Sequence, residues 1–191
     1  MPAAIVDYTD SRAIFTGYFM KATRKFFLFL LLVFCSVLYA DEETSRTVQT
    51  PYSEPKVVYD FYFDNPEKIN SALYWIRSLM NPLLDDPYGM APEFMEIKVV
   101  IHGTEIVTVA RKNYEKYKTA VERMRYYASL GVEFKVCGIA AHDYGYGTDG
   151  FYEFIDVVPS GINELAHWQL QGYALITPTV MEKKLSIDEI R

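Results

Sequence analysis

Hydrophobic residues follow two different periods along the chain between residues 56 and 178. The two-residue period of a half-buried strand is clearest at 131–141, whose alternating apolar positions are Val132, Phe134 and Val136. Gly131 is placed to take the left-handed conformation that ends a helix, and Cys137 stands where the strand ends. Ligands of open α/β sheets sit beyond the carboxyl ends of the strands, so we expect any chemistry of this chain near Cys137.

Five segments have the composition or the period of strands, and helical segments lie between them. The expected strands are 56–63, 96–102, 132–137, 156–158 and 173–177. The expected helices run from Pro66 to Met80, from Asn113 to Leu130, and between Ser160 and Gly172. Strands that alternate with helices in this way predict βαβ units. The expected fold is therefore α/β, with a five-stranded parallel sheet and helices on both of its faces.

Prolines and a capping residue set the expected boundaries of the first helix. Asn65 can cap its first turn, and Pro66 fits the first helical position. The segment 81–95 is expected to be a loop, because its helical period is interrupted by Pro82, Pro87 and Pro92.

Shorter segments give weaker patterns. Residues 104–110 fit either a loop or the beginning of a helix, and residues 151–155 fit a helical turn. The segment 141–150 contains three glycines and two tyrosines, which predicts a mobile or ligand-facing loop. In the last helix, the apolar face is expected to consist of Ile162, Leu165, Ala166, Gln169 and Leu170.

Residues 20–40 have the three parts of a secretory signal peptide. Basic residues come first, a 13-residue apolar run from Phe26 to Leu38 follows with only Ser36 interrupting it, and Ala40 fits the cleavage position. The apolar run is short for a transmembrane helix, so we expect cleavage, export to the periplasm and no stable membrane span afterwards. An uncleaved leader that anchors the protein to the membrane is the alternative.

The other terminal segments carry no core pattern. Residues 1–19 precede the signal peptide and do not resemble part of one, so we expect them to be an overlong start with Met20 as the true first residue. Residues 41–55 are polar, contain two prolines and are expected to form a flexible leader, and 179–191 are expected to form a charged tail.

The distribution of charge limits the classes of partner. The whole chain has a formal net charge of −6, and residues 1–40 contribute +2 (four basic against two acidic residues), so residues 41–191 carry −8. Nucleic-acid binding needs a basic stripe, and the tyrosines of this chain are not interleaved with arginine and lysine as stacking on bases requires. We therefore expect neither nucleic acid nor an anionic membrane surface as a partner.

Four segments, taken in order, resemble the DsrE/DsrF-like family. They are Val-Val-Ile-His-Gly at 99–103, Gly-Val-Glu-Phe-Lys-Val-Cys-Gly at 131–138, Val-Val-Pro-Ser-Gly-Ile-Asn-Glu-Leu at 157–165 and Gln-Gly-Tyr-Ala-Leu-Ile at 171–176. The resemblance runs from about Lys56 to Pro178. It implies a flavodoxin-like three-layer α/β/α fold and assembly into homo-oligomers or with related subunits.

The resemblance also implies a chemistry. The best understood members act in cytoplasmic sulfur relay, in which a cysteine carries persulfide sulfur between partner proteins. The cysteine of this chain at the corresponding position is Cys137. Those members are cytoplasmic, whereas this chain has the features of an exported protein. The resemblance therefore supports the fold of this chain more strongly than it supports a role in sulfur relay.

Cys137 has a functional and a structural interpretation. Without residues 20–40 it is the only cysteine, so no intramolecular disulfide can form. As a nucleophile, its thiolate would be stabilised by the backbone N–H groups and the dipole of a following helix. As a structural residue, it would fill space at the end of a strand.

Two histidines are candidates to assist this cysteine. His102 and His142 follow the ends of the second and third expected strands, and a Cys–His pair can activate a thiol. A hydrogen-bonded structural role or a surface position is the alternative for each. Cys137, His142 and Asp143 match no strong zinc spacing, and the glycines of 141–150 lack the context of a phosphate-binding loop, so no metal and no cofactor is expected.

Two functional hypotheses follow. In the first, the protein carries sulfur or acts like a sulfurtransferase through Cys137, with a sulfur donor or acceptor protein as its partner. In the second, it is a non-catalytic oligomeric binding module with a buried, structural Cys137.

Overall fold

A computed structural model describes residues 44–191 of the 191-residue chain. Every helix and strand of the described residues lies in the second of two units, Pro51–Arg191. The predictions for 1–19 and 20–40 fall outside the described residues. Within the described part, no helix is both long and apolar enough to cross a membrane.

Five parallel strands form a single sheet with the order β4-β3-β2-β1-β5. The strands are β1 (Lys56–Phe61), β2 (Glu96–Ile101), β3 (Glu133–Cys137), β4 (Ile155–Val158) and β5 (Ala174–Ile176). The parallel sheet predicted from the alternation of periods is confirmed. Because all strands run the same way, their carboxyl ends meet at one edge, where ligands of such sheets bind.

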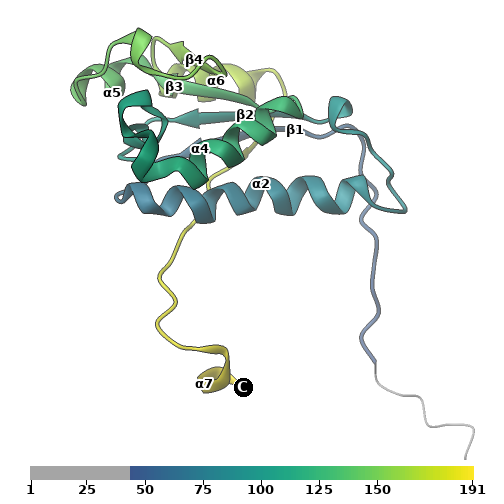
Figure 1. The fold of residues 1–191 in the computed structure, drawn as a ribbon. Coiled ribbons are helices and arrows are strands. Elements are labelled where there is room, and N and C mark those ends of the chain that lie inside the picture. The colour runs from purple at the N-terminus through teal and green to yellow at the C-terminus, as the bar shows by residue number, and fades with distance from the viewer. Residues whose placement is uncertain (1–43) are drawn as a thin grey trace, which may run out of the picture. The chain divides into compact units, whose positions relative to one another are not determined.

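Helices cover both faces of this sheet (Figure 1). The helices α2 (Ile69–Leu84) and α4 (Tyr114–Ser129) lie on one face, and α6 (Gly161–Leu170) lies on the other. The shorter α-helices are α3 (Ile106–Val109), α5 (Gly138–Asp143) and α7 (Ile187–Ile190). Single 3-10 turns occur at Pro66–Lys68, Pro92–Phe94, Arg111–Asn113 and Thr148–Gly150.

The face toward α2 and α4 holds the main apolar core. Its strand residues alternate along the sheet and are buried: Val57, Tyr59, Phe61, Ile97, Val99, Ile101, Phe134 and Val136. The facing stripe of α2 has the helical spacing that the sequence predicts, with Ile69, Ala72, Leu73, Ile76 and Met80 buried. Burial of these side chains is the main source of stability for the unit.

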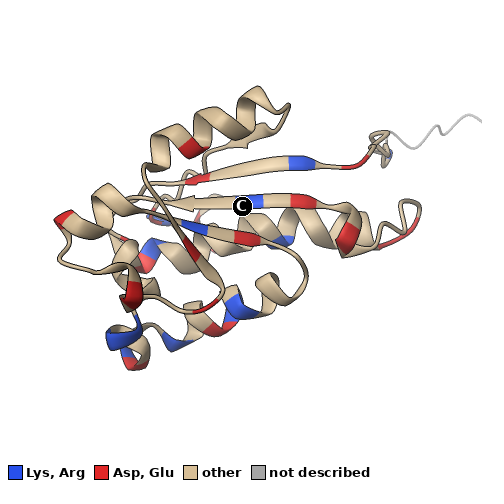
Figure 2. Cartoon of the chain, turned by 90° about the horizontal axis from the view of Figure 1, so that it is seen from above, with Lys and Arg blue, Asp and Glu red and all other residues tan. Residues whose placement is uncertain are grey.

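The face toward α6 is polar by comparison. Its small apolar cluster contains Val58, Val100, Leu165 and Tyr173, with Trp168 packed against it. Lys98 of β2 and Lys135 of β3 are buried on this face, and the ammonium group of Lys98 lies 4.7 Å from the centre of the Trp168 ring. Figure 2 shows residues of both charges on the strands themselves.

Ion pairs compensate the two buried lysines. Lys98 binds Glu133, and the ammonium group of Lys135 lies 3.2 Å from both Glu133 and Asp156. Glu164 of α6 is 3.8 Å from the same ammonium group. Buried charges need such partners, because an unpaired ammonium group loses its hydration without compensation.

The structure corrects the predicted end of the first helix. α2 continues through Pro82 to Leu84, although a loop was predicted from residue 81. Pro82 lies in the last turn, two residues before the helix ends at Leu84, so its missing N–H removes only one hydrogen bond near a terminus. Leu83 is buried against the core, which stabilises this last turn.

The predicted apolar face of the last helix is wrong except at Leu165, which is buried. Ile162 and Leu170 are 63% and 85% exposed, and the inner stripe of α6 consists of Gly161, Leu165 and Trp168. The lysines of the sheet explain this rotation. Turning Trp168 and Glu164 inward gives Lys98 and Lys135 an aromatic face and a carboxylate.

Of three shorter segments, 104–110 agrees with one of its two predicted alternatives, and the other two differ from the weaker patterns of the sequence. Residues 151–155 are not helical: Phe151 pairs with Ala110 in an isolated antiparallel bridge, and Ile155 begins β4. The segment 104–110, whose sequence fits either a loop or the beginning of a helix, contains α3. The segment 141–150 begins inside α5 and ends in a 3-10 turn, so much of it is regular.

Candidate functional site

Three strands end next to one another at the carboxyl edge of the sheet, and their polar side chains form the candidate site. β1 pairs with β2, and β2 pairs with β3. The register places Ile101 opposite Val136, so the next residues, His102 and Cys137, emerge side by side. The sequence predicts that His102 can approach Cys137, and the strand order provides the physical reason.

Gly161, the first residue of α6, sits directly against this pair. A methyl group built at Gly161 would lie 3.1 Å from Cβ of His102 and 3.2 Å from Cβ of Cys137. Both side chains therefore flank the same point at the amino end of α6. Any larger residue at position 161 would push the helix away from the two strands.

Cys137 is the last residue of β3 and the residue before α5. It is 7% exposed, and it is a free thiol. In the alternation of β3 it falls with Glu133 and Lys135, on the face of the sheet that α6 covers. The thiol is thus buried beneath α6.

His102 is held by a carboxylate from the neighbouring strand. Its Nε2 lies 2.7 Å from Oδ1 of Asp60 in β1, and the two side chains are 12% and 21% exposed. The hydroxyl group of Thr177 lies 3.4 Å from the other oxygen of Asp60. A neutral His102 that donates from Nε2 keeps Nδ1 as its free, proton-accepting nitrogen.

Tyr62 covers the histidine ring from the solvent side. The two rings are stacked, with centres 4.9 Å apart and an angle of 23° between their planes. Tyr62 itself is exposed. The imidazole is therefore fixed both in its plane, by Asp60, and across its face, by Tyr62.

A buried carboxylate fixes the backbone that carries His102. Glu105 is fully buried and accepts hydrogen bonds from the backbone N–H groups of His102, Gly103 and Phe63, at 3.1, 2.8 and 3.0 Å. Burial raises the pKa of Glu105, and the three N–H groups oppose that rise. The clamp ties the end of β2 to the chain that follows β1.

Gly103 is required by the same clamp. A Cβ at this position would come within 2.6 Å of both Oε2 of Glu105 and the backbone nitrogen of Phe63. A side chain cannot be accommodated there without displacing the backbone. The His-Gly pair at 102–103 is thus explained by packing around Glu105.

His142 lies elsewhere. It belongs to the last turn of α5, its side chain is 91% exposed, and its nearest charged neighbour is Asp143, at 3.7 Å. It lines an open groove of about 520 Å³ together with Ile139, Thr148 and Pro159. The structure therefore brings His102 to Cys137 and leaves His142 at the surface.

The arrangement offers nucleophilic chemistry and no ready metal site. In residues 44–191, no group of three or more His, Cys, Asp or Glu side chains is placed to hold a metal ion. Ser160 forms an ordinary cap, accepting a hydrogen bond from the backbone nitrogen of Asn163 at 3.5 Å. A thiol beside an imidazole that a carboxylate orients is an arrangement that can produce a thiolate nucleophile.

Sequence reasoning missed Asp60, Tyr62 and Glu105. Asp60 could have been noticed, because it is the one charged residue inside the apolar run that follows Lys56. An acidic side chain inside a buried strand needs a partner. The identity of that partner could not be found without knowing that β1 lies next to β2.

Comparison with known proteins gives a family match and a structural match. The model of the DsrE/DsrF-like family matches residues 56–178. A search of curated proteins finds no match. Among solved structures, a protein of unknown function, MTH1491 from Methanobacterium thermoautotrophicum, is 24% identical with a TM-score of 0.52, covering 65% of this chain and 99% of that one. At this identity the structural match supports the fold alone.

Proposed function

The chain belongs to the DsrE/DsrF-like family, and from this premise we propose that it carries sulfur as a persulfide on Cys137. The observation that supports the proposal most directly is the Asp60–His102 pair beside the end of β3, where the only described cysteine stands.

The proposed step is a transfer of sulfane sulfur. The thiolate of Cys137 attacks the outer sulfur of a donor persulfide, R–S–SH, and the S–S bond of the donor breaks. R–S⁻ leaves, and Cys137 becomes Cys–S–SH. No electrons are gained or lost overall, so no cofactor is needed. Attack by an acceptor thiolate on the outer sulfur of Cys137 reverses the step and releases the cargo.

His102 and Asp60 have separate roles in this scheme. The Nδ1 atom of His102 takes the proton of the Cys137 thiol, and Asp60 holds the ring in the tautomer that leaves Nδ1 free. Asp60 is a positioning residue, because it acts through His102. The small exposed fraction of Cys137 would protect a bound persulfide from bulk solvent.

A loading experiment tests the proposal. The purified protein is incubated with a low-molecular-weight persulfide, and its intact mass is followed over time. We expect the mass of one added sulfur atom, no addition to Cys137→Ser, and loading slowed on the order of 10²-fold in His102→Gln. The matched control is His167→Gln, which replaces an exposed histidine of α6 and should load at the wild-type rate.

The second candidate is the binding module, which the burial of Cys137 favours. It predicts that the thiol stays unmodified in the loading experiment and that Cys137→Ser lowers the unfolding free energy. A wild-type protein that gains no sulfur would contradict a sulfur-carrying Cys137, and a His102→Gln protein that loads as fast as wild type would contradict the role of His102.

We also propose that the protein is exported and acts as a homo-oligomer or with a related subunit. Support for export comes from the signal-peptide pattern of 20–40, with a membrane anchor as the alternative. Support for assembly comes from the outward face of α6, where the apolar side chains of Ile162 and Leu170 are exposed.

A further inference from the structure

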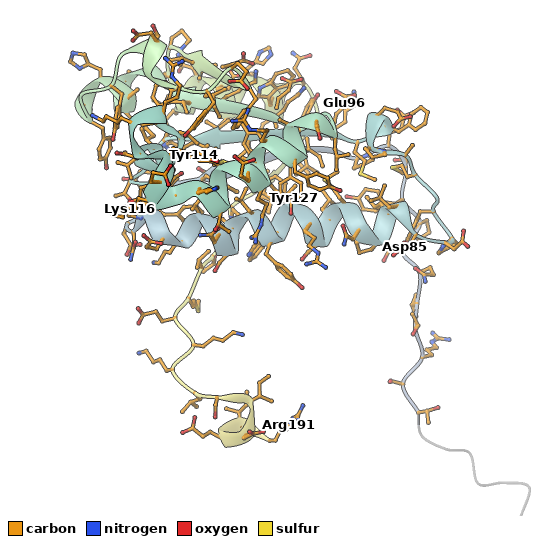
Figure 3. All side chains as sticks on the ribbon, in the orientation of Figure 1. Asp85, Glu96, Tyr114, Lys116, Tyr127 and Arg191 are labelled. Atoms are coloured by element: carbon orange, nitrogen blue, oxygen red, sulfur yellow. The ribbon has the colours of Figure 1, made fainter. Side chains whose placement is uncertain are left out.

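A second concave surface lies between α2 and α4, on the face of the sheet opposite α6. Tyr74, Arg77 and Asn81 of α2 and Arg123, Tyr126 and Tyr127 of α4 line a cavity of about 350 Å³, named here the α2–α4 groove. Figure 3 shows Tyr127 between the two helices. The groove is separated from Cys137 by the sheet itself.

Regular helix geometry places these side chains together. Positions 74, 77 and 81 follow a helical stripe of α2, and positions 123, 126 and 127 follow one of α4. The same helices are anchored to the sheet by their buried faces. The lining is thus held on two rigid elements, as a preformed ligand site requires.

The two arginines of the groove have no acidic partner among the described residues. Neither Arg77 nor Arg123 occurs in any ion pair there, in a chain with a net charge of −6. Arg77 lies against the ring of Tyr74, with 5.9 Å between its guanidinium carbon and the ring centre. Arg123 donates one hydrogen bond, 3.1 Å long, to the backbone oxygen of Asn70.

The positive charges of both guanidinium groups influence the pKa of the Tyr127 phenol. Tyr127 is 6% exposed; burial raises its pKa, while Arg123 and Arg77 oppose the rise. A guanidinium has five N–H donors, so most donors of both arginines are unused by the protein. The groove therefore presents positive charge and free donors next to aromatic rings.

We propose that the α2–α4 groove binds a small organic anion with a planar ring, of the aryl phosphate or aryl carboxylate class. The oxyanion would take the free N–H donors of Arg77 and Arg123, which match phosphate and carboxylate geometry. The ring would lie against the exposed rings of Tyr74 and Tyr126. The cavity volume is at the lower end of the range for small-molecule sites, which fits a ligand of this size.

Calorimetric titration of the purified protein with phenyl phosphate tests this site. We expect saturable binding at one site per chain, weakened at least tenfold by Arg77→Gln and by Arg123→Gln. Arg123→Lys keeps the charge but not the planar fork, and should also bind more weakly. Circular dichroism of each variant shows whether the fold is retained, and Arg77, which donates no backbone hydrogen bond, provides the test least coupled to folding.

The matched control is Arg125→Gln, which lies on α4 like Arg123 and removes one positive charge as Arg123→Gln does. Arg125 lies outside the groove and donates to Glu153 at 2.6 Å, so its loss should leave the affinity unchanged. Absence of saturable binding, or an equal loss in Arg125→Gln, would overturn the proposal. Equal affinity for inorganic phosphate and phenyl phosphate would overturn the part assigned to the aromatic rings.

Discussion

At the scale of single residues, the candidate site depends on side chains that hold the backbone in place as well as on the side chains proposed to react. His102 contacts Asp60 and Tyr62. Its backbone is held by Glu105, which accepts hydrogen bonds from the backbone N–H of His102, after β2, and of Phe63, after β1. Removing this carboxylate is expected to affect stability and the site together.

The Glu105→Gln variant tests the clamp. Glutamine keeps the shape but offers one oxygen, and its amide N–H₂ would face a backbone N–H where an acceptor is needed. We expect the unfolding free energy to fall by about 1–3 kcal/mol, measured by denaturant titration, because a buried donor loses its partner.

The control for this substitution is Glu93→Gln, an exposed glutamate with the same chemical change. Its unfolding free energy should stay within about 0.5 kcal/mol of wild type. If Glu105→Gln were as stable as Glu93→Gln, the clamp would have no energetic role.

At this scale, the sequence offered Cys137 and His102 as candidates because each stands at the end of a recognisable strand pattern. It did not predict Asp60 or Tyr62, because their roles depend on contacts between strands that are distant in sequence. His142 was predicted as an assistant from its place after a strand, and the start of α5 carries it to the surface instead.

At the scale of elements, the two faces of the sheet are built differently. α2 and α4 cover an apolar face, and their buried stripes follow the spacing in the sequence. α6 covers a face with two buried lysines. It turns Glu164 toward Lys135 and Trp168 toward Lys98, and its most apolar stripe does not face the sheet. Local patterns therefore predicted α4 well and the rotation of α6 badly.

The same reasoning explains the end of α2. The rule that proline interrupts a helix holds for helix interiors, but Pro82 lies in the final turn, where one lost hydrogen bond is offset by the burial of Leu83. The sequence shows the proline, whereas the burial of Leu83 comes from tertiary packing that a local pattern does not contain.

The lysine network beneath α6 predicts how stability depends on pH. Burial tends to raise the pKa of Glu133, but Lys98 and Lys135 outweigh it and lower that pKa below 4.5. Its stabilisation is present above pH 4.5 and is lost as the pH falls through the folded-state pKa. Burial tends to lower the pKa of Lys135, but Glu133 and Asp156 raise it above 10.5, so that stabilisation is lost as the pH rises through the folded-state value.

Unfolding free energies measured across pH test this account. We expect a plateau between the two ordinary pKa values, 4.5 and 10.5, with a decline on each side. Glu133→Gln should reduce both declines, and Glu115→Gln, at an exposed position of α4, should leave them as in wild type. Parallel curves for wild type and Glu133→Gln would show that the network does not contribute.

At the scale of the whole molecule, the order of the strands assembles the site. Alternating periods predicted the parallel sheet, and the parallel sheet placed Cys137 and His102 at one edge. β1 lies between β2 and β5. His102, which follows β2, and Thr177, which follows β5, therefore both lie beside Asp60 of β1. The sequence contains these residues in widely separated segments, so their meeting could not be predicted from local patterns.

The two proposed sites lie on opposite faces of the sheet and have different chemistry. The thiol site is shielded by α6 and suits a covalent cargo, whereas the α2–α4 groove is open, basic and aromatic. Failure of one would leave the other in place, because they share no residue.

We propose that Cys137 carries sulfur, and the decisive measurement is the intact mass of protein isolated from its native compartment without reductant. We expect a chain that begins at Asp41, after cleavage at Ala40, and carries one or more extra sulfur atoms on Cys137. A mature chain with an unmodified thiol, even after exposure to a sulfur donor, would contradict it and leave the binding module as the function to pursue.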